Sequence, residues 1–404
     1  MAAAASAETR ESVPRHRWWE VLRAFTLLGL TSFGGPIAHL SFFRTEFVDR
    51  RAWLRDEEYA DLVSLCQFLP GPASSQVGMT IGLRRAGLAG AVAAWCGFTL
   101  PSAIALAAFG LGAISGVPDG VLHGLMLVAV GVVAQALWQM ARTACRGVPE
   151  VLIAVAAAAT AILWTDSWVQ FTIVALGLAL GWALFRARTP AVPSAAQPQV
   201  VSVRAGIISL TVFAALLIAL PILAALTAVF AIDVTDVFYR VGSTVFGGGH
   251  VVLPLLESQV VGAGWVSADD FVAGYGAAQA VPGPLFTFSA FLGASMSSPL
   301  LMAPLALLAI FLPSLLLVVG VMPFWDRLRT VPALRAALRG VNAAVVGILA
   351  AAFYRPVLTS AIGQWQDVVI AMVAFAALIW LKLPPWVVVL GTVIIALAAW
   401  QLTR

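Results

Sequence analysis

Charged residues are scarce in this 404-residue chain: they make up 10% of the sequence, whereas 61% of the residues are hydrophobic. The mean hydropathy is +0.97. Because water-soluble domains carry about 25% charged residues, this composition excludes a soluble protein. Cysteine is also rare, and Cys66, Cys96 and Cys145 stand singly without a Cys-x-x-Cys motif or a Cys/His cluster. We therefore expect small buried cysteines, no disulfide framework, no metal and no other cofactor.

Motifs of catalysis and of nucleotide binding are missing too. The chain has no His-Glu-x-x-His, Gly-x-Ser-x-Gly, Walker A or dinucleotide glycine motif in a suitable context, so we expect no enzyme. It also lacks a soluble nucleotide-binding domain, so any transport must draw on an ion gradient or a partner protein. The net charge of +4 comes from arginines scattered at segment ends, which excludes a clustered nucleic-acid-binding patch.

Apolar runs, by contrast, recur along nearly the whole chain, and crossing a bilayer takes about 20 apolar residues in a helix. They indicate an all-α, polytopic transmembrane helical bundle that has the lipid bilayer as its partner. Residues 1–17 are polar and have no apolar stretch before a cleavage site, so we expect a disordered cytosolic tail and not a signal peptide. The main apolar runs are Ala86–Ile114, Val121–Met140, Val151–Trp164, Trp168–Phe185, Ala205–Phe230, Leu300–Met322, Val368–Leu381 and Trp386–Leu402.

The two halves of the chain share one pattern. Blocks of the first half recur in the same order 212 or 213 residues later, which indicates a duplication. We divide the chain into a first repeat (18–185), a flexible linker (186–204), a connecting span (205–230) and a second repeat (231–404). The matching blocks are Phe33-Gly34-Gly35 with Phe246-Gly247-Gly248, Trp53 with Trp265, Gln67–Pro72 with Gln279–Pro284, and Phe98–Ser102 with Ile310–Ser314.

The distribution of charge predicts that the repeats are inverted, because basic residues mark cytosolic loops. Six arginines in the first repeat have acidic or neutral residues at the equivalent positions of the second. One loop later the bias reverses, since Ser115–Asp119 lacks basic residues and its counterpart is rich in arginine. We expect a cytosolic N-terminus and a C-terminus outside. The six arginines are Arg44, Arg50, Arg51, Arg55, Arg84 and Arg85, and the later ones in the second repeat are Arg327, Arg329, Arg335 and Arg339.

Inverted repeats with paired broken helices are the pattern of secondary transporters, in which the substrate lies where the breaks meet. Glycine and proline interrupt helices, so the two Pro-Gly-Pro motifs predict re-entrant segments that bend back within the membrane. The paired glycines Gly34, Gly35, Gly247 and Gly248 are candidate hinges. The alternative for these glycines is close packing between helices.

Each Pro-Gly-Pro motif precedes a half-helix whose first amides have no partner within the helix, and such an end binds anions. Two such ends facing each other predict a cage for a small anion. The alternative is that each motif is only a tight turn. The candidate binding residues are Gln67, Pro70, Gly71, Pro72, Ser74, Ser75 and Gln76 in the first repeat, and Gln279, Pro282, Gly283, Pro284 and Thr287 in the second.

Ionisable residues near membrane depth form a second candidate group, for proton coupling or for attracting anions. His39 and His250 follow the two Gly-Gly motifs, and Arg44, Glu46, Arg84 and Arg85 lie at the ends of apolar segments. The alternatives are structural histidines, side chains that extend to the interface, and arginines that only set the topology.

The motifs of the two halves resemble those of the chromate ion transporter family, in its long-chain, two-domain form. The resemblance implies a bacterial inner-membrane protein that exports chromate, driven by the membrane potential or the proton gradient, with sulfate as competitor. Open alternatives are a transporter for another oxyanion such as sulfate, an anion channel, and a membrane enzyme or scaffold; a homodimer is one option for the assembly. The motifs are Ser32–Pro36, Glu46–Val48, Trp53, Leu69–Pro72, Leu100–Ser102, Phe246–Gly249, Val281–Pro284 and Leu312–Ser314.

Overall fold

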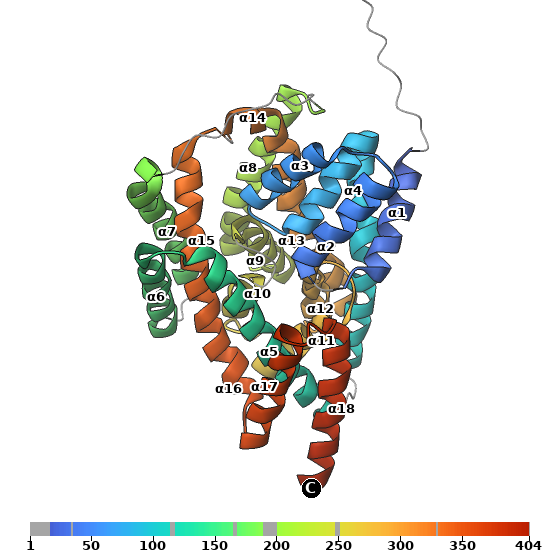
Figure 1. Ribbon diagram of the computed structural model, residues 1–404, viewed down its shortest axis with the longest axis vertical. Helices are drawn as coiled ribbons and strands as arrows, with labels where there is room; N and C mark the ends of the chain where they lie inside the picture. Colours follow the sequence, from blue (N-terminus) through green and yellow to red (C-terminus); the bar gives the residue numbers. More distant parts are fainter. Residues whose placement is uncertain are drawn as a thin grey trace, which may run out of the picture.

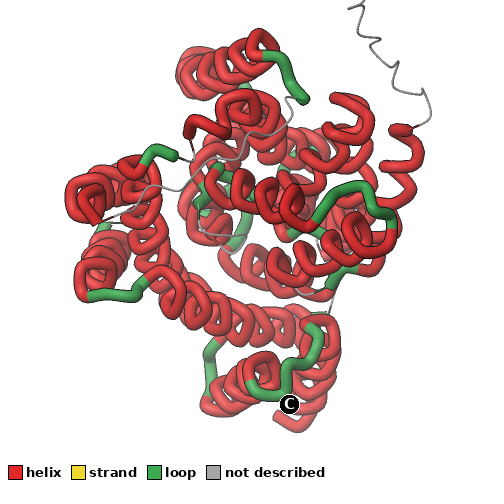
Figure 2. The backbone as a smooth tube through the Cα atoms, turned by 45° about the horizontal axis from the view of Figure 1, so that its top comes forward, coloured by secondary structure: helices red, strands yellow, loops and turns green. Residues whose placement is uncertain are grey.

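A computed structural model describes residues 17–33, 35–113, 118–164, 168–188, 200–246, 251–328 and 330–403. These residues form helices and loops and include no strand (Figure 1, Figure 2). The all-α fold predicted from the sequence is therefore confirmed. Five helical stretches are long and apolar enough to cross a membrane: Ala73–Gly112, Asp119–Ala144, Val203–Thr227, Pro299–Leu328 and Pro332–Ala361.

The helices follow the duplication, with one extra helix between the repeats. The first repeat comprises α1 (Arg17–Thr31), α2 (Gly35–Arg44), α3 (Asp56–Phe68), α4 (Ala73–Ala113), α5 (Asp119–Ala144), α6 (Val148–Leu163) and α7 (Val169–Phe185). The extra helix is α8 (Val203–Thr227). The second repeat comprises α9 (Phe230–Thr244), α10 (Val252–Val260), α11 (Ala268–Ala280), α12 (Phe288–Ala294), α13 (Pro299–Val321), α14 (Trp325–Leu328), α15 (Pro332–Ala352), α16 (Thr359–Ala361), α17 (Trp365–Ile379) and α18 (Pro385–Thr403).

The first four helices form two hairpins that return to the same end of the molecule. Nη2 of Arg85, where α4 bends, lies 3.0 Å from Oε2 of Glu20 near the start of α1. Nε of Arg44, the last residue of α2, lies 2.7 Å from Oδ1 of Asp56, the first residue of α3. The open ends of the two hairpins therefore lie together, and the chain re-enters the bundle as the glycine and proline pattern predicted.

The second repeat has the opposite orientation. Nε1 of Trp325, on α14, donates to Oδ1 of Asp61 on α3 at 3.2 Å, and its ring packs on Phe68. The corner between α13 and α14 thus lies beside the first repeat's hairpins, whereas α11, α16 and α17 lie in the other half of the molecule (Figure 1). The inverted arrangement explains why arginines of different loops in the two repeats gather at one end.

The two repeats also exchange helices, because the long helix of each packs on the last two helices of the other. On α5, Gly124 contacts Val393 of α18 and Gly131 contacts Ala374 of α17. Gly340 and Gly347, which are likewise seven residues apart on α15, pack on α7 and α6 respectively. Glycine permits this close approach of helices in a membrane, where small residues form the contacts. The exchange makes the two repeats one folding unit.

Replacing Gly340 by valine is expected to destabilise the protein by about 3 kcal/mol or more, because an added side chain would collide with the backbone of Gly177 and Gly181 on α7. Thermal unfolding of the purified protein in detergent measures the loss. Gly391→Val on α18 is the matched control, because no atom lies within 4 Å of a Cβ at Gly391. Equal melting temperatures for the two variants would contradict the packing role of Gly340.

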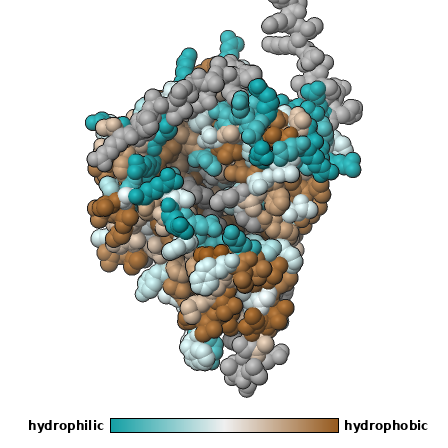
Figure 3. All heavy atoms as spheres, in the orientation of Figure 1, coloured by the Kyte–Doolittle hydropathy of each residue, from teal (hydrophilic) through white to brown (hydrophobic). Residues whose placement is uncertain are grey.

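The extra helix α8 has lipid as its main surrounding. Only 6% of its apolar window is buried, compared with 72% for Pro332–Ala361, and it packs on α9 and α13 alone among its larger contacts. A helix that is apolar on all sides and exposed is stable in hydrocarbon and not in water. Figure 3 shows hydrophobic side chains on the flanks of the molecule and hydrophilic ones around a central hollow. The molecule therefore has the surface of a membrane protein.

One contact breaks the symmetry between the repeats. In the second repeat, α11 packs on α5 and α18. Its counterpart α3 packs on α2 and α4 of its own repeat, and among the described residues it has no comparable contact with α15 or α7. The bundle is therefore closed around α11 and looser around α3.

Candidate functional site

The first Pro-Gly-Pro motif separates two helices inside the bundle. Leu69 is extended, as a residue before proline must be, and Gly71 has a φ of +119°. The first helical hydrogen bond runs from N–H of Gln76 to the carbonyl of Pro72 at 3.0 Å. The amides of Ala73, Ser74 and Ser75 thus have no carbonyl within α4 to bond. The anion-binding role of this helix end stays a prediction.

The second Pro-Gly-Pro motif repeats this geometry with one difference. Gly283 has a φ of +106°, and the chain resumes as a 3₁₀ turn over Leu285–Thr287 before α12. N–H and Oγ1 of Thr287 both donate to the carbonyl of Pro284, at 3.0 and 2.7 Å. The tighter turn occupies the Thr287 hydroxyl, so the two helix ends are not equivalent.

Each turn is fixed by the opposite repeat. N–H of Gly71 donates to the carbonyl of Val245 at 2.7 Å, and N–H of Gly283 donates to the carbonyl of Ser32 at 3.0 Å. A side chain at Gly71 would meet Oγ of Ser314, and one at Gly283 would meet Oγ of Ser102. Because these pairs are related by the same duplication offset, the two turns lie at one two-fold interface between the repeats.

Polar atoms without partners gather in these same segments. Buried polar atoms normally have hydrogen-bond partners, so several buried polar atoms without one indicate a missing partner such as a water or an ion. Most belong to hydroxyl or amide groups that can donate to an oxyanion. In the described part of the chain, the buried side-chain atoms without a partner in these segments include Oγ of Ser32, Ser75 and Ser314, Oγ1 of Thr99, Oε1 of Gln76 and Nε2 of Gln279.

His39 lies at this interface. Its Nε2 is 3.2 Å from the carbonyl oxygen of Ser32, which also accepts from Gly283, and its Nδ1 is 3.4 Å from Oγ of Ser74. The ring is fully buried against Phe98. His39 therefore links a break of the first repeat to the turn of the second. The paired hinge residue Gly35 is the first residue of α2, whereas Gly34, Gly247, Gly248 and His250 lie outside the described residues.

The structure distributes the predicted binding residues unequally. Pro70, Gly71, Pro72 and Ser75 are at the first turn, and Pro282, Gly283, Pro284 and Gln279 are at the second. Gln67 is exposed in the last turn of α3, Ser74 is engaged by His39, and the Thr287 hydroxyl is engaged by Pro284. Ser75, Gln76 and Gln279 are thus the predicted residues whose side chains have polar atoms without a partner in the described part of the chain.

The charged candidates lie at the ends of the hairpins, far from the turns. Glu46 is buried and accepts from Arg51 at 2.6 Å and from Arg50 at 3.3 Å, while Arg44 pairs with Asp49 and Asp56. Arg85 pairs with Glu20 and lies over the ring of Trp53. From Ala73 to Arg84 and Arg85 the helix extends about 17 Å. The structure does not bring this group together with the Pro-Gly-Pro turns.

Ser32, Thr99, Ser102 and Ser314 join the site although they were not expected there. Ser102 and Ser314 end the two Leu-Pro-Ser motifs, which recur at the same offset as the Pro-Gly-Pro motifs. That shared offset was a signal in the sequence, because elements that repeat together around one two-fold axis meet their counterparts at it. In the described residues, no cluster of three or more metal-ligating side chains is present.

Replacing Ser75 and Ser314 together by alanine is expected to raise the KM for the transported anion about 100-fold or more, since each of the two hydrogen bonds to a charged group contributes about 1.5–3 kcal/mol. The melting temperature should stay the same or rise, because both hydroxyls are buried without a partner. Ser209→Ala is the control. The hydroxyl of Ser209 donates to the carbonyl of Leu316 at 2.8 Å, so this variant should have a lower melting temperature and an unchanged KM. A normal KM in the double variant would contradict the site.

Comparison with known proteins agrees with the duplication. The family model for chromate transporters matches residues 19–182 and again residues 232–397. A chromate transport protein of Pseudomonas aeruginosa is 27% identical over 354 residues, covering 85% of this chain and 82% of that protein. A chromate transport protein of Cupriavidus metallidurans is 27% identical over 410 residues, covering 97% and 95%. A probable chromate transport protein of Synechococcus elongatus is 27% identical over 347 residues, covering 84% of each.

No solved structure matches the chain significantly. The family is therefore assigned from sequence, and the geometry of the interface comes from this structure. Both copies of the family model fall on the two inverted repeats, which together hold the paired turns. The chain belongs to the chromate transporter family.

Proposed function

We propose that the protein is a secondary transporter that exports chromate across the bacterial inner membrane by alternating access. The observation that carries the proposal is the pair of Pro-Gly-Pro turns, each bonded to the opposite repeat and surrounded by buried polar atoms without partners. Relatives named as chromate transport proteins support chromate as the cargo. Another small oxyanion such as sulfate is the alternative, because helix-end amides discriminate weakly between tetrahedral dianions.

The unequal packing of the repeats supports alternating access. A carrier built from inverted repeats opens to one side when one repeat adopts the conformation of the other, so each state is asymmetric. Here α11 packs on α5 and α18, while α3 lacks the equivalent contacts. If α3 acquired the contacts that α11 has and α11 lost them, the opening to the binding site would move from the α3 side of the bundle to the α11 side.

The orientation follows from the arginines. Arg44, Arg51 and Arg85 lie at the end where the first repeat's hairpins begin, and the positive-inside rule places that end in the cytosol. The C-terminus, at the opposite end of the molecule, is then periplasmic (Figure 1). Each negative charge that leaves a cell whose interior is 100 mV negative releases about 2.3 kcal/mol. The membrane potential therefore favours export of an oxyanion.

Chromate uptake into everted membrane vesicles, measured with and without excess sulfate and with an uncoupler, tests the proposal. Uptake should require the protein, fall when the uncoupler is added and decrease with sulfate. Vesicles with and without the protein that accumulate chromate equally would refute it. Trans-stimulation by unlabelled anion inside the vesicles separates a carrier from a channel, since only a carrier shows it, and a scaffold would change no oxyanion accumulation.

A further inference from the structure

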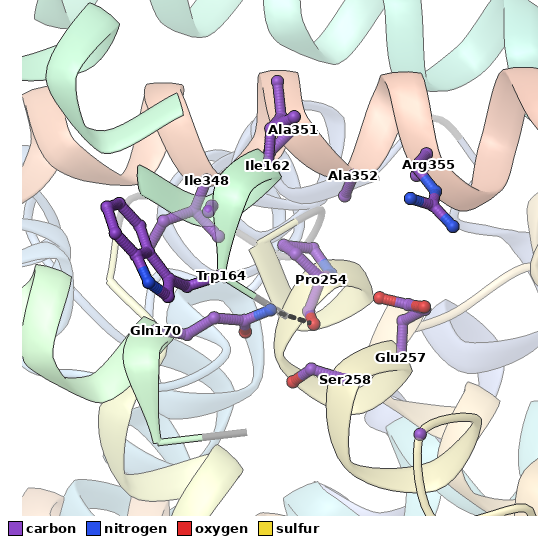
Figure 4. A pocket seen from close by; sticks show the side chains of 12 residues that line it. Ile162, Trp164, Gln170, Pro254, Glu257, Ser258, Ile348, Ala351, Ala352 and Arg355 are labelled. Carbon is purple, nitrogen blue, oxygen red and sulfur yellow. Dashed lines mark hydrogen bonds between the residues drawn. The ribbon is translucent and has the colours of Figure 1, made fainter. Parts of the chain in front are cut away.

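A cavity of about 430 Å³ lies between the two repeats, apart from the Pro-Gly-Pro turns. The first repeat contributes the end of α6 and the start of α7, and the second contributes α10 and the end of α15. Figure 4 shows the carboxylate of Glu257 on α10 and the guanidinium of Arg355, which follows α15, pointing toward one another in this cavity. None of the described residues that line it belongs to the turns.

The two charges face each other without touching. Within the described residues, Arg355 and Glu257 form no ion pair within 4.0 Å, and neither side chain has a hydrogen-bond partner. Beside them, Gln170 donates from Nε2 to the carbonyl of Pro254 at 2.9 Å, and its Oε1 is buried without a partner. Two opposite charges that face each other across a polar cavity without an ion pair are costly inside a membrane protein. Such charges indicate a functional site.

Among the described residues, the charged group that acts on Glu257 is Arg355. The nearest side chains from α6 and α7 are the uncharged Trp164 and Gln170, and α10 itself adds Ser258. On α9, Asp236 is paired with Arg240 and lines no part of the cavity. The first repeat has no carboxylate at the position that corresponds to Glu257, because Arg44 stands there and pairs with Asp49 and Asp56.

We infer that this cavity is a second oxyanion site, in which Arg355 holds the anion and Glu257 is protonated when the anion binds. The inference rests on the proposed transport function and adds a step at the outer half of the path. An ionised Glu257 repels an oxyanion and competes for Arg355. A protonated Glu257 removes the repulsion and donates its O–H to the anion. By linkage, anion binding and proton binding at this site strengthen each other.

The sign of the pH dependence follows directly. The anion-binding form of Glu257 is the protonated one, so binding at the cavity strengthens as the pH falls and weakens as the pH rises. One linked proton changes the affinity by up to about tenfold per pH unit. The described residues at the turns include no carboxylate, so the affinity of that site should vary less over the same range.

Calorimetric titration of the purified protein with sulfate at about pH 6 and about pH 8 tests the inference, and chromate is titrated in parallel. Sulfate stays unprotonated between these pH values. The wild type should bind two anions at the lower pH, and the second event should weaken by at least about tenfold at the higher pH. Glu257→Gln imitates the protonated carboxyl and should bind two anions at both pH values. Arg355→Gln should bind one anion at both pH values.

Asp269→Asn is the matched control, since Asp269 is an exposed carboxylate at the start of α11 and lines no part of the cavity. This variant should keep the pH dependence of the wild type. A wild-type protein that binds a single anion at both pH values, or a Glu257→Gln variant that keeps the pH dependence, would overturn the second site. Binding of neither sulfate nor chromate at either pH would instead contradict the proposed transport function itself.

Discussion

Replacing Gly71 or Gly283 by alanine is expected to lower chromate transport about 100-fold or more, because displacing a binding geometry by about 1 Å has effects of that size. A Cβ at Gly71 would lie 2.5 Å from Oγ of Ser314 and 2.7 Å from Nε2 of Gln76, and one at Gly283 would lie 2.8 Å from Oγ of Ser102. Both glycines also have positive φ values that other residues adopt at a cost. Initial rates in everted vesicles measure the effect.

Gly87→Ala separates crowding of the site from strain in the backbone. Gly87 also has a positive φ, of +62°, but a Cβ there meets no atom within 4 Å. Gly87→Ala should therefore have the cost of a strained backbone at a positive φ but retain most of the transport activity. All three variants should insert into the membrane in normal amounts, as quantified by immunoblot. Normal transport by Gly71→Ala and Gly283→Ala would place the anion site elsewhere in the protein.

Replacing Arg339 by methionine is expected to destabilise the protein by about 3 kcal/mol, near the lower end of the range for breaking a buried ion pair. Arg339 on α15 pairs with Glu150 on α6, whose side chain is 1% exposed, whereas the arginine is 45% exposed. Without the arginine, the carboxylate of Glu150 stays buried and unpaired at the contact between the repeats. The melting temperature of the detergent-solubilised protein should fall accordingly.

The double variant Glu150→Leu with Arg339→Met should recover much of the lost stability, since it removes the buried charge together with its partner. Arg142→Met is the control for the loss of an arginine, because Arg142 lies over the ring of Trp138 and pairs with no described carboxylate. Its effect should stay below about 1 kcal/mol. A single Arg339→Met variant as stable as Arg142→Met would show that the pair does not hold the repeats together.

The predictions from sequence were strongest where they depended on local pattern. Pro70 and Pro72 had to interrupt a helix because proline lacks an N–H and restricts the residue before it, and α3 ends at Phe68. Arginines in different loops of the two repeats predicted the inversion. The hydrogen bond from Trp325 of the second repeat to Asp61 of the first agrees with it. The roles of the predicted binding residues stay proposals, and Gln67 and Thr287 show how a side chain near a turn can point to solvent or bond its own backbone.

The sequence by itself determined that the protein is a membrane protein, that it contains two inverted repeats, and where its helices break. Hydrophobicity, charge bias and proline act on the backbone within a few residues of their own position, so a local pattern is enough to predict these features. Only the tertiary structure decided that Gly71 lies against Ser314 and Gly283 against Ser102, that α5 and α15 exchange partners, and that Glu257 faces Arg355. Such contacts join residues that are far apart in the chain, and packing of whole helices selects them.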